Sequence, residues 1–249
     1  AIIKVPLIDK HKNNVELIVR SMGVVLILLL ATYLRFRFID SQSLWYDEGN
    51  SARMILRSTK EIVASAAADV HPPAYYLLLK AWAGIIGGSE FGLRSLSAFA
   101  GLLVVSGMYV LGHKLGKHIV GIFAGIFGAI HPGLVYYSQE VRMYMVCTLL
   151  SVILIYISVR LSHFRNSNRI THINLWHILF VLCATSGLYV HYAFGFVLAA
   201  VYLSFAYEIL TIDRKYRIKF ILELVFLQIG MLILYMPWLS TAIQHLTSW

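Results

Sequence analysis

The stretch LIVRSMGVVLILLLATYL, residues 17–34, contains one charged residue, Arg20, and is otherwise almost wholly apolar. A helix of about 20 apolar residues crosses the roughly 30 Å hydrocarbon core of a bilayer, so this stretch predicts a membrane span. The whole chain agrees, because 59% of its 249 residues are hydrophobic and only 13% are charged. Soluble domains contain roughly 45–50% apolar residues. The sequence therefore predicts an all-α polytopic membrane protein, folded as a bundle of transmembrane helices.

Six further apolar runs follow, and with the first they predict about seven spans in a single transmembrane domain covering residues 1–249. The predicted spans are residues 17–34, 92–112, 119–136, 143–160, 175–191, 194–211 and 220–238. The first is longer than a signal-peptide core and no small-residue cleavage site follows it, which favours a retained helix. The chain starts with Ala and stops just after a span, so we expect it to be the N-terminal part of a longer protein.

The net charge of +9 is concentrated in the short loops between the predicted spans. If the N-terminus is cytoplasmic, every short basic loop lies on the cytoplasmic side, as the positive-inside rule requires. The residues are Lys4, Lys10, Lys12, Arg20, Lys114, Lys117, Arg160, Arg165, Arg169, Arg214, Lys215, Arg217 and Lys219. This distribution is typical of an integral membrane protein and requires no nucleic-acid partner. In a prokaryote the membrane would be the plasma (inner) membrane, with residues 35–91 forming an extracytoplasmic loop.

Within this outer loop, the stretch SLWYDEGNS, residues 43–51, carries two adjacent carboxylates, Asp47 and Glu48. Residues 50–66 then repeat apolar and basic side chains at helical spacing, a pattern typical of a helix that lies in the membrane interface. The next stretch, DVHPPAYYLLLKAW (residues 69–82), predicts a second interfacial helix. Its two prolines suit the first helical turn, where a missing amide hydrogen costs nothing.

Two more polar clusters fall on the same predicted membrane face. HPGLVYYSQEVRMYM, residues 131–145, places Glu140 and Arg142 at the start of a span, where a charge near the hydrocarbon is costly. GLYVHYAFG places His191 and Tyr192 at the outer end of another span. Three polar clusters that are separated in sequence are therefore expected to converge on one side of the membrane.

These blocks resemble the membrane glycosyltransferases of the C-type fold, specifically the protein O-mannosyltransferase-like superfamily that includes the lipid A aminoarabinose transferases. The resemblance lies within residues 40–195, in SLWYDEGNSARMI, DVHPPAYYLLLKAW, GSEFGLRSLSA, YYSQEVRMY and LYVHYAFG. It implies an inverting transfer of a hexose or pentose from a polyprenyl-phosphate carrier to an acceptor hydroxyl or phosphate on the extracytoplasmic face. The catalytic Asp maps to Asp47, with Glu48 beside it, and a further acidic residue maps to Glu140. Asn50 stands where the aminoarabinose subgroup has an Arg.

The chemistry of this transfer selects the remaining candidate residues. A carboxylate within about 3 Å of an acceptor hydroxyl can accept its proton, which favours Asp47 as the general base. The leaving phosphate needs a cation, and the planar guanidinium of Arg matches phosphate oxygens. The candidates for binding the donor phosphate are Arg142, Arg53, Arg94 and His71. The candidates for lining the acceptor site or cavity are Tyr46, Tyr137, His191 and Tyr192.

Alternative interpretations remain open at this stage. An Asp-Glu pair after a span can be a helix cap with a favourable helix-dipole interaction, and His71 can be a helix-entry residue. His191 with Glu48 or Asp69 could bind a divalent cation, although a lone His at an interface is more often simply hydrogen-bonded. The chain could also be a non-catalytic subunit of a membrane complex, or, less in keeping with its one-sided polar clusters, a transporter. The acceptor could be a lipid, a glycan or a protein, and membrane lipids surround the site.

Overall fold

A computed structural model of the protein describes residues 6–166 and 174–247, and the regular structure in these ranges is α-helical throughout. Five helices of the described ranges are long and apolar enough to cross a membrane. They are Ile18–Phe36, Glu90–Ile130, Tyr144–Ser162, Phe194–Thr211 and Arg214–His245. The predicted class, an all-α polytopic membrane protein, is therefore confirmed.

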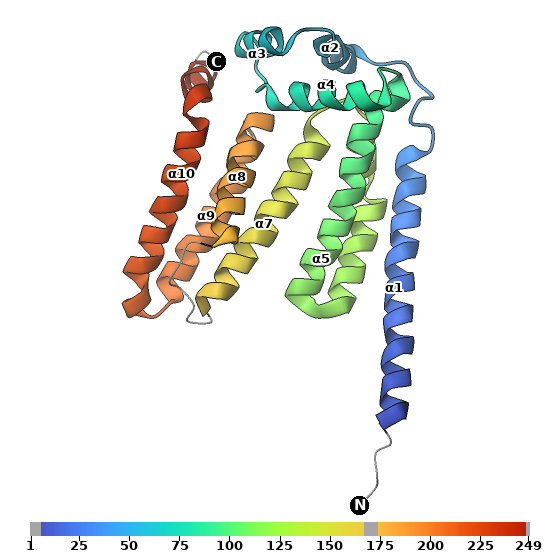
Figure 1. Ribbon diagram of the computed structural model, residues 1–249, viewed down its shortest axis with the longest axis vertical. Coiled ribbons are helices and arrows are strands. Elements are labelled where there is room, and N and C mark those ends of the chain that lie inside the picture. Colours follow the sequence, from blue (N-terminus) through green and yellow to red (C-terminus); the bar gives the residue numbers. More distant parts are fainter. Residues whose placement is uncertain (1–5, 167–173, 248–249) are drawn as a thin grey trace, which may run out of the picture.

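The longer helices lie side by side in a bundle (Figure 1). They are α1 (Pro6–Phe36), α5 (Glu90–Ile130), α7 (Tyr144–Asn166), α8 (Leu175–Val190), α9 (Phe194–Thr211) and α10 (Arg214–Thr247). Three short helices lie across one end of this bundle (Figure 1). They are α2 (Tyr46–Met54), α3 (Thr59–Ala67) and α4 (Ala74–Ile86), which we call the helix layer. The predicted outer loop thus folds as a layer that covers one end of the bundle.

The structure corrects two expectations about this layer. Residues 50–66 do not form one helix, because Ser58 caps a new one: the amide of Glu61 donates to Ser58 Oγ (3.3 Å), and the amide of Ser58 donates to Glu61 Oε2 (2.7 Å). The helical spacing of apolar and basic residues continues across Ser58, so the spacing alone does not indicate that a new helix starts there. Pro72 and Pro73 precede α4 and do not lie in its first turn.

The long helix α5 turns back on itself, so that its two arms run antiparallel (Figure 1). The turn lies at Gly116 and Lys117, whose backbone leaves the helical region, and Lys117 has a positive φ of 65°. The arms contain the predicted span 92–112 and most of the predicted span 119–136. They approach closely at Gly121, where a Cβ atom would lie 2.9 Å from a backbone oxygen of the first arm. Glycine therefore allows the tight packing of the two arms.

Two side chains cap the ends of α1 and α5 that lie next to the helix layer. Arg35 is fully buried, and its guanidinium donates to the backbone oxygens of Gly128 (2.9 Å) and Ala129 (3.2 Å) at the end of α5. Gln139 Nε2, just after α6 (Pro132–Ser138), donates to three backbone oxygens at the end of α1 at 2.9–3.3 Å. These carbonyls have no partner within their own helices. The two caps therefore fix α1, α5 and α6 together at this end.

A shared hydrophobic core joins the helix layer to the bundle. Tyr75, Tyr76 and Leu79 of α4 are buried in one cluster with side chains from α5, from the segment before α7 and from the first turn of α7. The neighbours in that cluster are Leu93, Leu96, Ala100, Val104, Val141, Met143, Met145 and Val146. The layer is thus held firmly against the bundle end, and three connecting segments meet beneath it: the one before α2, the one between α6 and α7, and the one between α8 and α9.

Candidate active site

The acidic residue Asp47 and the basic residue Arg142 meet at the edge of the helix layer. Asp47 lies in the first turn of α2, and its side chain is 36% exposed. Arg142 lies between α6 and α7 and is buried, with Nη2 3.6 Å from Asp47 Oδ2 and Nη1 3.5 Å from the backbone oxygen of Asp47. The buried Nε atom of Arg142 has no hydrogen-bond partner. The structure therefore brings two sequence-predicted site residues together, and one N–H of the guanidinium has no partner in the protein.

Aromatic rings from three segments form a row of neighbouring rings that begins next to Arg142. The ring centroids of Tyr137 and Tyr144 are 4.8 Å apart, those of Tyr144 and His191 are 5.9 Å apart, and those of His191 and His71 are 5.8 Å apart. The guanidinium carbon of Arg142 lies 5.6 Å from the centroid of Tyr144. We call these four rings the aromatic ladder. The predicted residues Tyr137, His191 and His71 thus lie in the same neighbourhood as Arg142.

The environment of His71 disfavours the protonated form of its imidazole. Burial and the positive charge of Arg142 lower the pKa of His71 from its usual value of 6.5, whereas Asp69 acts in the opposite direction. Asp69 lies close enough for this effect, because His71 Nδ1 is 3.6 Å from Asp69 Oδ2. Desolvation disfavours an imidazolium, and a nearby cation adds to that penalty. A neutral imidazole can donate one hydrogen bond and accept another, which suits contact with sugar hydroxyls.

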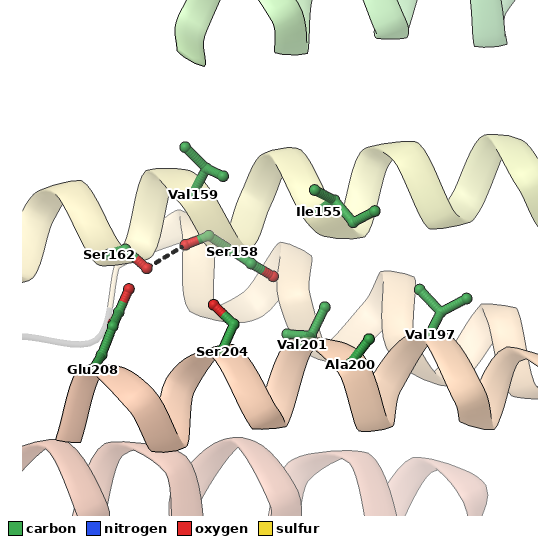
Figure 2. Close-up of a pocket in the computed structure, with 9 residues that line it drawn as sticks. All are labelled: Ile155, Ser158, Val159, Ser162, Val197, Ala200, Val201, Ser204 and Glu208. Atoms are coloured by element: carbon green, nitrogen blue, oxygen red, sulfur yellow. Dashed lines mark hydrogen bonds between the residues drawn. The ribbon is translucent and has the colours of Figure 1, made fainter. Parts of the chain in front are cut away.

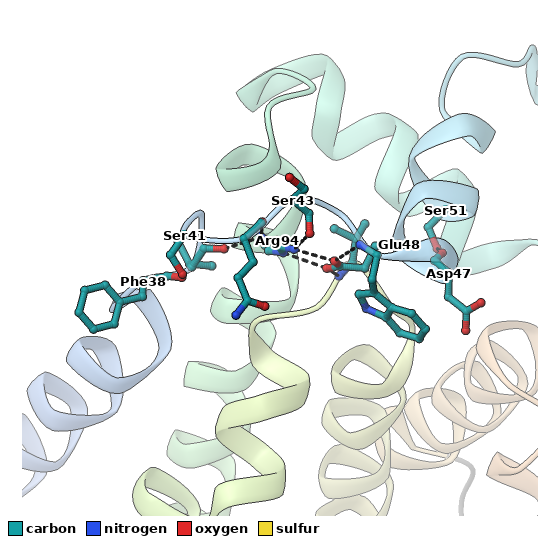
Figure 3. A network of polar contacts seen from close by, with 11 residues as sticks. Phe38, Ser41, Ser43, Asp47, Glu48, Ser51 and Arg94 are labelled. Carbon is teal, nitrogen blue, oxygen red and sulfur yellow. Dashed lines mark hydrogen bonds and ion pairs between the residues drawn. The ribbon is translucent and has the colours of Figure 1, made fainter.

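Glu48, the second residue of the acidic pair, points into the protein. Figure 3 shows its carboxylate directed at Arg94, whereas the Asp47 carboxylate is directed away from both. Glu48 is 1% exposed, and its Oε2 lies 2.6 Å from Arg94 Nη2 while its Oε1 lies 2.9 Å from Arg94 Nε. The Glu48 carboxylate also accepts hydrogen bonds from the amides of Val141 (2.8 Å) and Trp45 (3.3 Å).

Arg94 has all five of its N–H groups bonded within the protein. Two bind Glu48, and the others donate to the backbone oxygens of Ile39 (2.9 Å), Gln42 (2.7 Å) and Ser43 (3.3 Å). A donor phosphate would have to displace several of these buried bonds. Arg142 is therefore better placed than Arg94 to bind a phosphate.

The other sequence-predicted residues lie outside the Asp47–Arg142 pair and the ladder. Tyr46 is 80% exposed and Arg53 is exposed at the end of α2. The Tyr192 hydroxyl is bonded to Trp238 Nε1 (3.0 Å) and to His245 Nδ1 (2.9 Å). Glu140 is buried, which raises the pKa of its carboxyl group. Its acidic character is thereby reduced compared with that of an exposed carboxylate.

Sequence reasoning missed Tyr144 as a site residue. It follows Arg142 by two positions in the block YYSQEVRMY, and it links Tyr137 to His191 in the ladder. The proximity of an aromatic residue to an arginine at the start of a span was the available signal. Within residues 6–166 and 174–247, no group of three His, Cys, Asp or Glu side chains is arranged to hold a metal ion. The suggested cation site of His191 with Glu48 or Asp69 therefore has no such cluster in this part of the chain.

An apolar groove of about 430 Å³ lies between α4, α7, α8 and α10. Its lining is Ala74, Leu78, Val146, Leu150, Leu182, Thr185, Ser186, Tyr189, Val190 and Leu234. Val190 directly precedes the ladder residue His191, and Val146 follows Tyr144 by two positions. Two residues of the groove are therefore close in sequence to ladder residues, and the groove extends along helices of the bundle.

A second cavity, of about 300 Å³, lies between α7 and α9 and is shown in Figure 2. Its polar lining consists of Ser158, Ser162, Ser204 and Glu208. The hydroxyl of Ser162 donates to the backbone oxygen of Ser158 at 3.0 Å. This cavity shares no residue with the Asp47–Arg142 pair or the ladder, and its α7 lining lies in the half of that helix away from the helix layer (Figure 1).

The fold and the candidate site define a polytopic membrane protein with an acidic and a basic side chain paired at one end of a helical bundle. The family model of dolichyl-phosphate-mannose-protein mannosyltransferases matches residues 70–240, and the chain belongs to this family. It is thus a membrane glycosyltransferase of the mannosyltransferase type. Searches among curated proteins and among solved structures found no match. The matched range includes His71, Arg142 and His191, whereas Asp47 precedes it.

Proposed function

We propose that the protein transfers a sugar from a polyprenyl-phosphate carrier to an acceptor hydroxyl or phosphate on the extracytoplasmic face, with inversion at the anomeric carbon. The observation that carries this proposal is the meeting of an accessible carboxylate, Asp47, with a buried guanidinium, Arg142. Family membership supports the class of reaction. The donor, the acceptor and the roles of individual residues are our inference.

Asp47 acts as the general base in this proposal. An acceptor hydroxyl is a weak nucleophile, and removing its proton during attack typically accelerates transfer by about 10²–10⁴-fold. The side chain of Asp47 is 36% exposed, so an acceptor from the aqueous side can reach it. Its neighbour Glu48 is 1% exposed and saturated with hydrogen bonds, which makes it a poor alternative base.

Arg142 binds the phosphate of the carrier. As the acceptor oxygen forms its bond to the anomeric carbon, the bond from that carbon to the phosphate oxygen breaks and the leaving phosphate takes the electron pair. The acceptor proton moves to Asp47 in the same step. A guanidinium that is withdrawn from water stabilises this developing negative charge more strongly than an exposed one. Arg142 has the required position because it touches Asp47 and has one unpartnered N–H.

The groove and the ladder provide the remaining parts of a donor site. The prenyl chain of a lipid carrier is apolar and suits the groove between α4, α7, α8 and α10. The sugar would then lie against the aromatic ladder, whose ring faces suit the C–H faces of a pyranose. The proposal also allows a divalent cation to bind at the site together with the phosphate.

Turnover with a defined donor tests this function. The full-length protein in liposomes, supplied with polyprenyl-phosphate mannose and a panel of lipid, glycan and peptide acceptors, should form a mannosylated product of inverted anomeric configuration by NMR. Other polyprenyl-phosphate hexoses and pentoses complete the donor panel. A product with retained configuration would contradict the single-displacement mechanism. Absence of any product across both panels would favour the accessory-subunit alternative.

A further inference from the structure

The carboxylate of Glu48 accepts four hydrogen bonds from three separate segments of the chain. Oε1 accepts from Arg94 Nε (2.9 Å) and from the Val141 amide (2.8 Å). Oε2 accepts from Arg94 Nη2 (2.6 Å) and from the Trp45 amide (3.3 Å). An ionised carboxylate offers about four lone-pair positions, so Glu48 is fully satisfied. Figure 3 shows this network at the start of α2.

A helix cap alone does not account for this arrangement. The protein contains a direct comparison in α3, where Glu61 occupies the same third helical position and caps the Ser58 amide at 2.7 Å. Glu61 is exposed and does no more than a capping box requires. Glu48 adds a buried two-point contact with an arginine and a bond to a distant amide. These extra contacts connect the helix layer to α5 and to the segment before α7.

Two of the residues that form these contacts, Glu48 and Val141, are sequence neighbours of the candidate active-site residues. Asp47 directly precedes Glu48, and Arg142 directly follows Val141. The bond from the Val141 amide to Glu48 therefore joins the two backbones that carry the base and the phosphate-binding arginine. Arg94 holds the carboxylate in place, and it also binds three carbonyls of the segment leading into α2.

We propose that Glu48, held by Arg94, is a positioning residue that sets Asp47 against Arg142. This inference rests on the proposed function for its catalytic meaning, but its structural part stands on the contacts alone. Misplacing a catalytic group by about 1 Å costs on the order of 10²-fold in rate. The carboxylate of Glu48 thus acts through its neighbours and does not touch the substrate.

A cross-linking experiment tests the structural part without any substrate. In a background with Cys147→Ser and Cys183→Ser, cysteines at Asp47 and Arg142 are joined by a short bifunctional methanethiosulfonate reagent, because these two side chains converge. Adding Glu48→Gln or Arg94→Lys should slow cross-linking several-fold, whereas adding the matched change Glu61→Gln should leave the rate unchanged. Parent-like cross-linking in both the Glu48→Gln and the Arg94→Lys backgrounds would overturn the proposal. Arg94→Lys keeps the positive charge, so it serves where Glu48→Gln does not fold.

Kinetics of the full-length enzyme then distinguish a positioning role of Glu48 from a role that requires only opposite charges at positions 48 and 94. Glu48→Gln should lower kcat on the order of 10²-fold while the KM for the donor changes much less. The charge swap Glu48→Arg with Arg94→Glu should not restore kcat, since an arginine at position 48 cannot accept bonds from the amides of Val141 and Trp45. Restoration by the swap would overturn the proposal. If the parent transfers no sugar, the proposed function fails, and the cross-linking result still decides whether Glu48 positions Asp47.

Discussion

Two adjacent carboxylates on one helical turn have opposite environments in this protein. Asp47 faces solvent beside Arg142, whereas Glu48 is buried against Arg94. Successive residues of a helix point about 100° apart, so one can lie at an accessible edge while the next enters the core. This division gives each arginine its own partner, with Arg94 bonded fully within the protein and Arg142 left with an unpartnered N–H.

The first prediction at this scale concerns Arg142. Arg142→Ala should weaken binding of polyprenyl-phosphate mannose at least 10-fold, as expected for loss of a charge-assisted contact worth about 1.5–3 kcal/mol. Arg142→Lys should restore binding only in part, because an ammonium lacks the bidentate fork. Binding is measured by microscale thermophoresis in detergent, with Arg53→Ala as the exposed control. Loss of binding in Arg53→Ala and none in Arg142→Ala would reverse the assignment.

A second prediction follows from the lowered pKa of His71. In the native state the pKa of this imidazole lies below its ordinary value of 6.5, the value near which the unfolded chain binds the proton. The unfolded state therefore binds more protons just below pH 6.5, and the contribution of His71 to stability is lost as the pH falls through that value towards the native pKa. The thermal midpoint of the parent in detergent should fall between about pH 7.5 and about pH 5.5 more than that of His71→Gln. An equal fall in both proteins would contradict this linkage.

At the scale of helices, the end that carries the site depends on caps and close packing. Gly101 of α5 lies where a Cβ atom would be 2.2 Å from Ser138 Oγ and 2.7 Å from Arg35 Nε. An added methyl group would disturb the Arg35 cap on the end of α5. We expect Gly101→Ala to destabilise the protein by about 1–3 kcal/mol, the usual cost of overpacking.

The matched control for this substitution is Gly84→Ala. Gly84 lies in α4 with nothing within 4 Å of an added Cβ atom, so alanine should be neutral or stabilising by up to about 1 kcal/mol. Thermal unfolding of both variants in detergent measures the difference. A parent-like midpoint for Gly101→Ala would show that Ser138 and Arg35 rearrange without cost.

The long helices could be predicted from the apolar runs. A stretch of apolar residues long enough to cross a bilayer leaves few other structures for the backbone. The break at Ser58 could not be predicted from periodicity, since the apolar face of 50–66 continues through it. The convergence of Asp47 with Arg142 was expected only as a shared membrane face. Which carboxylate of the pair enters the core depends on Arg94, a residue 46 positions further along the chain, and local sequence carries no signal for that choice.

At the scale of the whole molecule, the basic segments gather at the end of the bundle opposite the helix layer. Lys114 and Lys117 lie at the turn of α5, and Arg214 to Lys219 lie at the start of α10 (Figure 1). This distribution supports a cytoplasmic position for that end and an extracytoplasmic position for the helix layer. The site would then face the side on which lipid-linked donor and external acceptor can meet.

Accessibility labelling tests this orientation. In the Cys147→Ser, Cys183→Ser background, cysteines at the exposed positions Ser43 and Leu56 should react with an impermeant maleimide added to intact cells. Cysteines at the exposed positions Lys117 and Lys215 should react only after the membrane is permeabilised. The reverse pattern would place Asp47 on the cytoplasmic side and remove the case for transfer outside.

The most direct test of the central claim is the rate of sugar transfer by Asp47→Asn in the full-length protein. Asparagine keeps the shape of the side chain but cannot accept the acceptor proton, so the rate should fall on the order of 10²-fold or more while carrier binding changes little. Glu140→Gln should cause a much smaller loss, and Asp40→Asn, an exposed carboxylate ahead of α2, should transfer at the parent rate. Transfer at the parent rate by Asp47→Asn, together with loss of transfer in Glu140→Gln, would place the base in the segment before α7 and contradict the account.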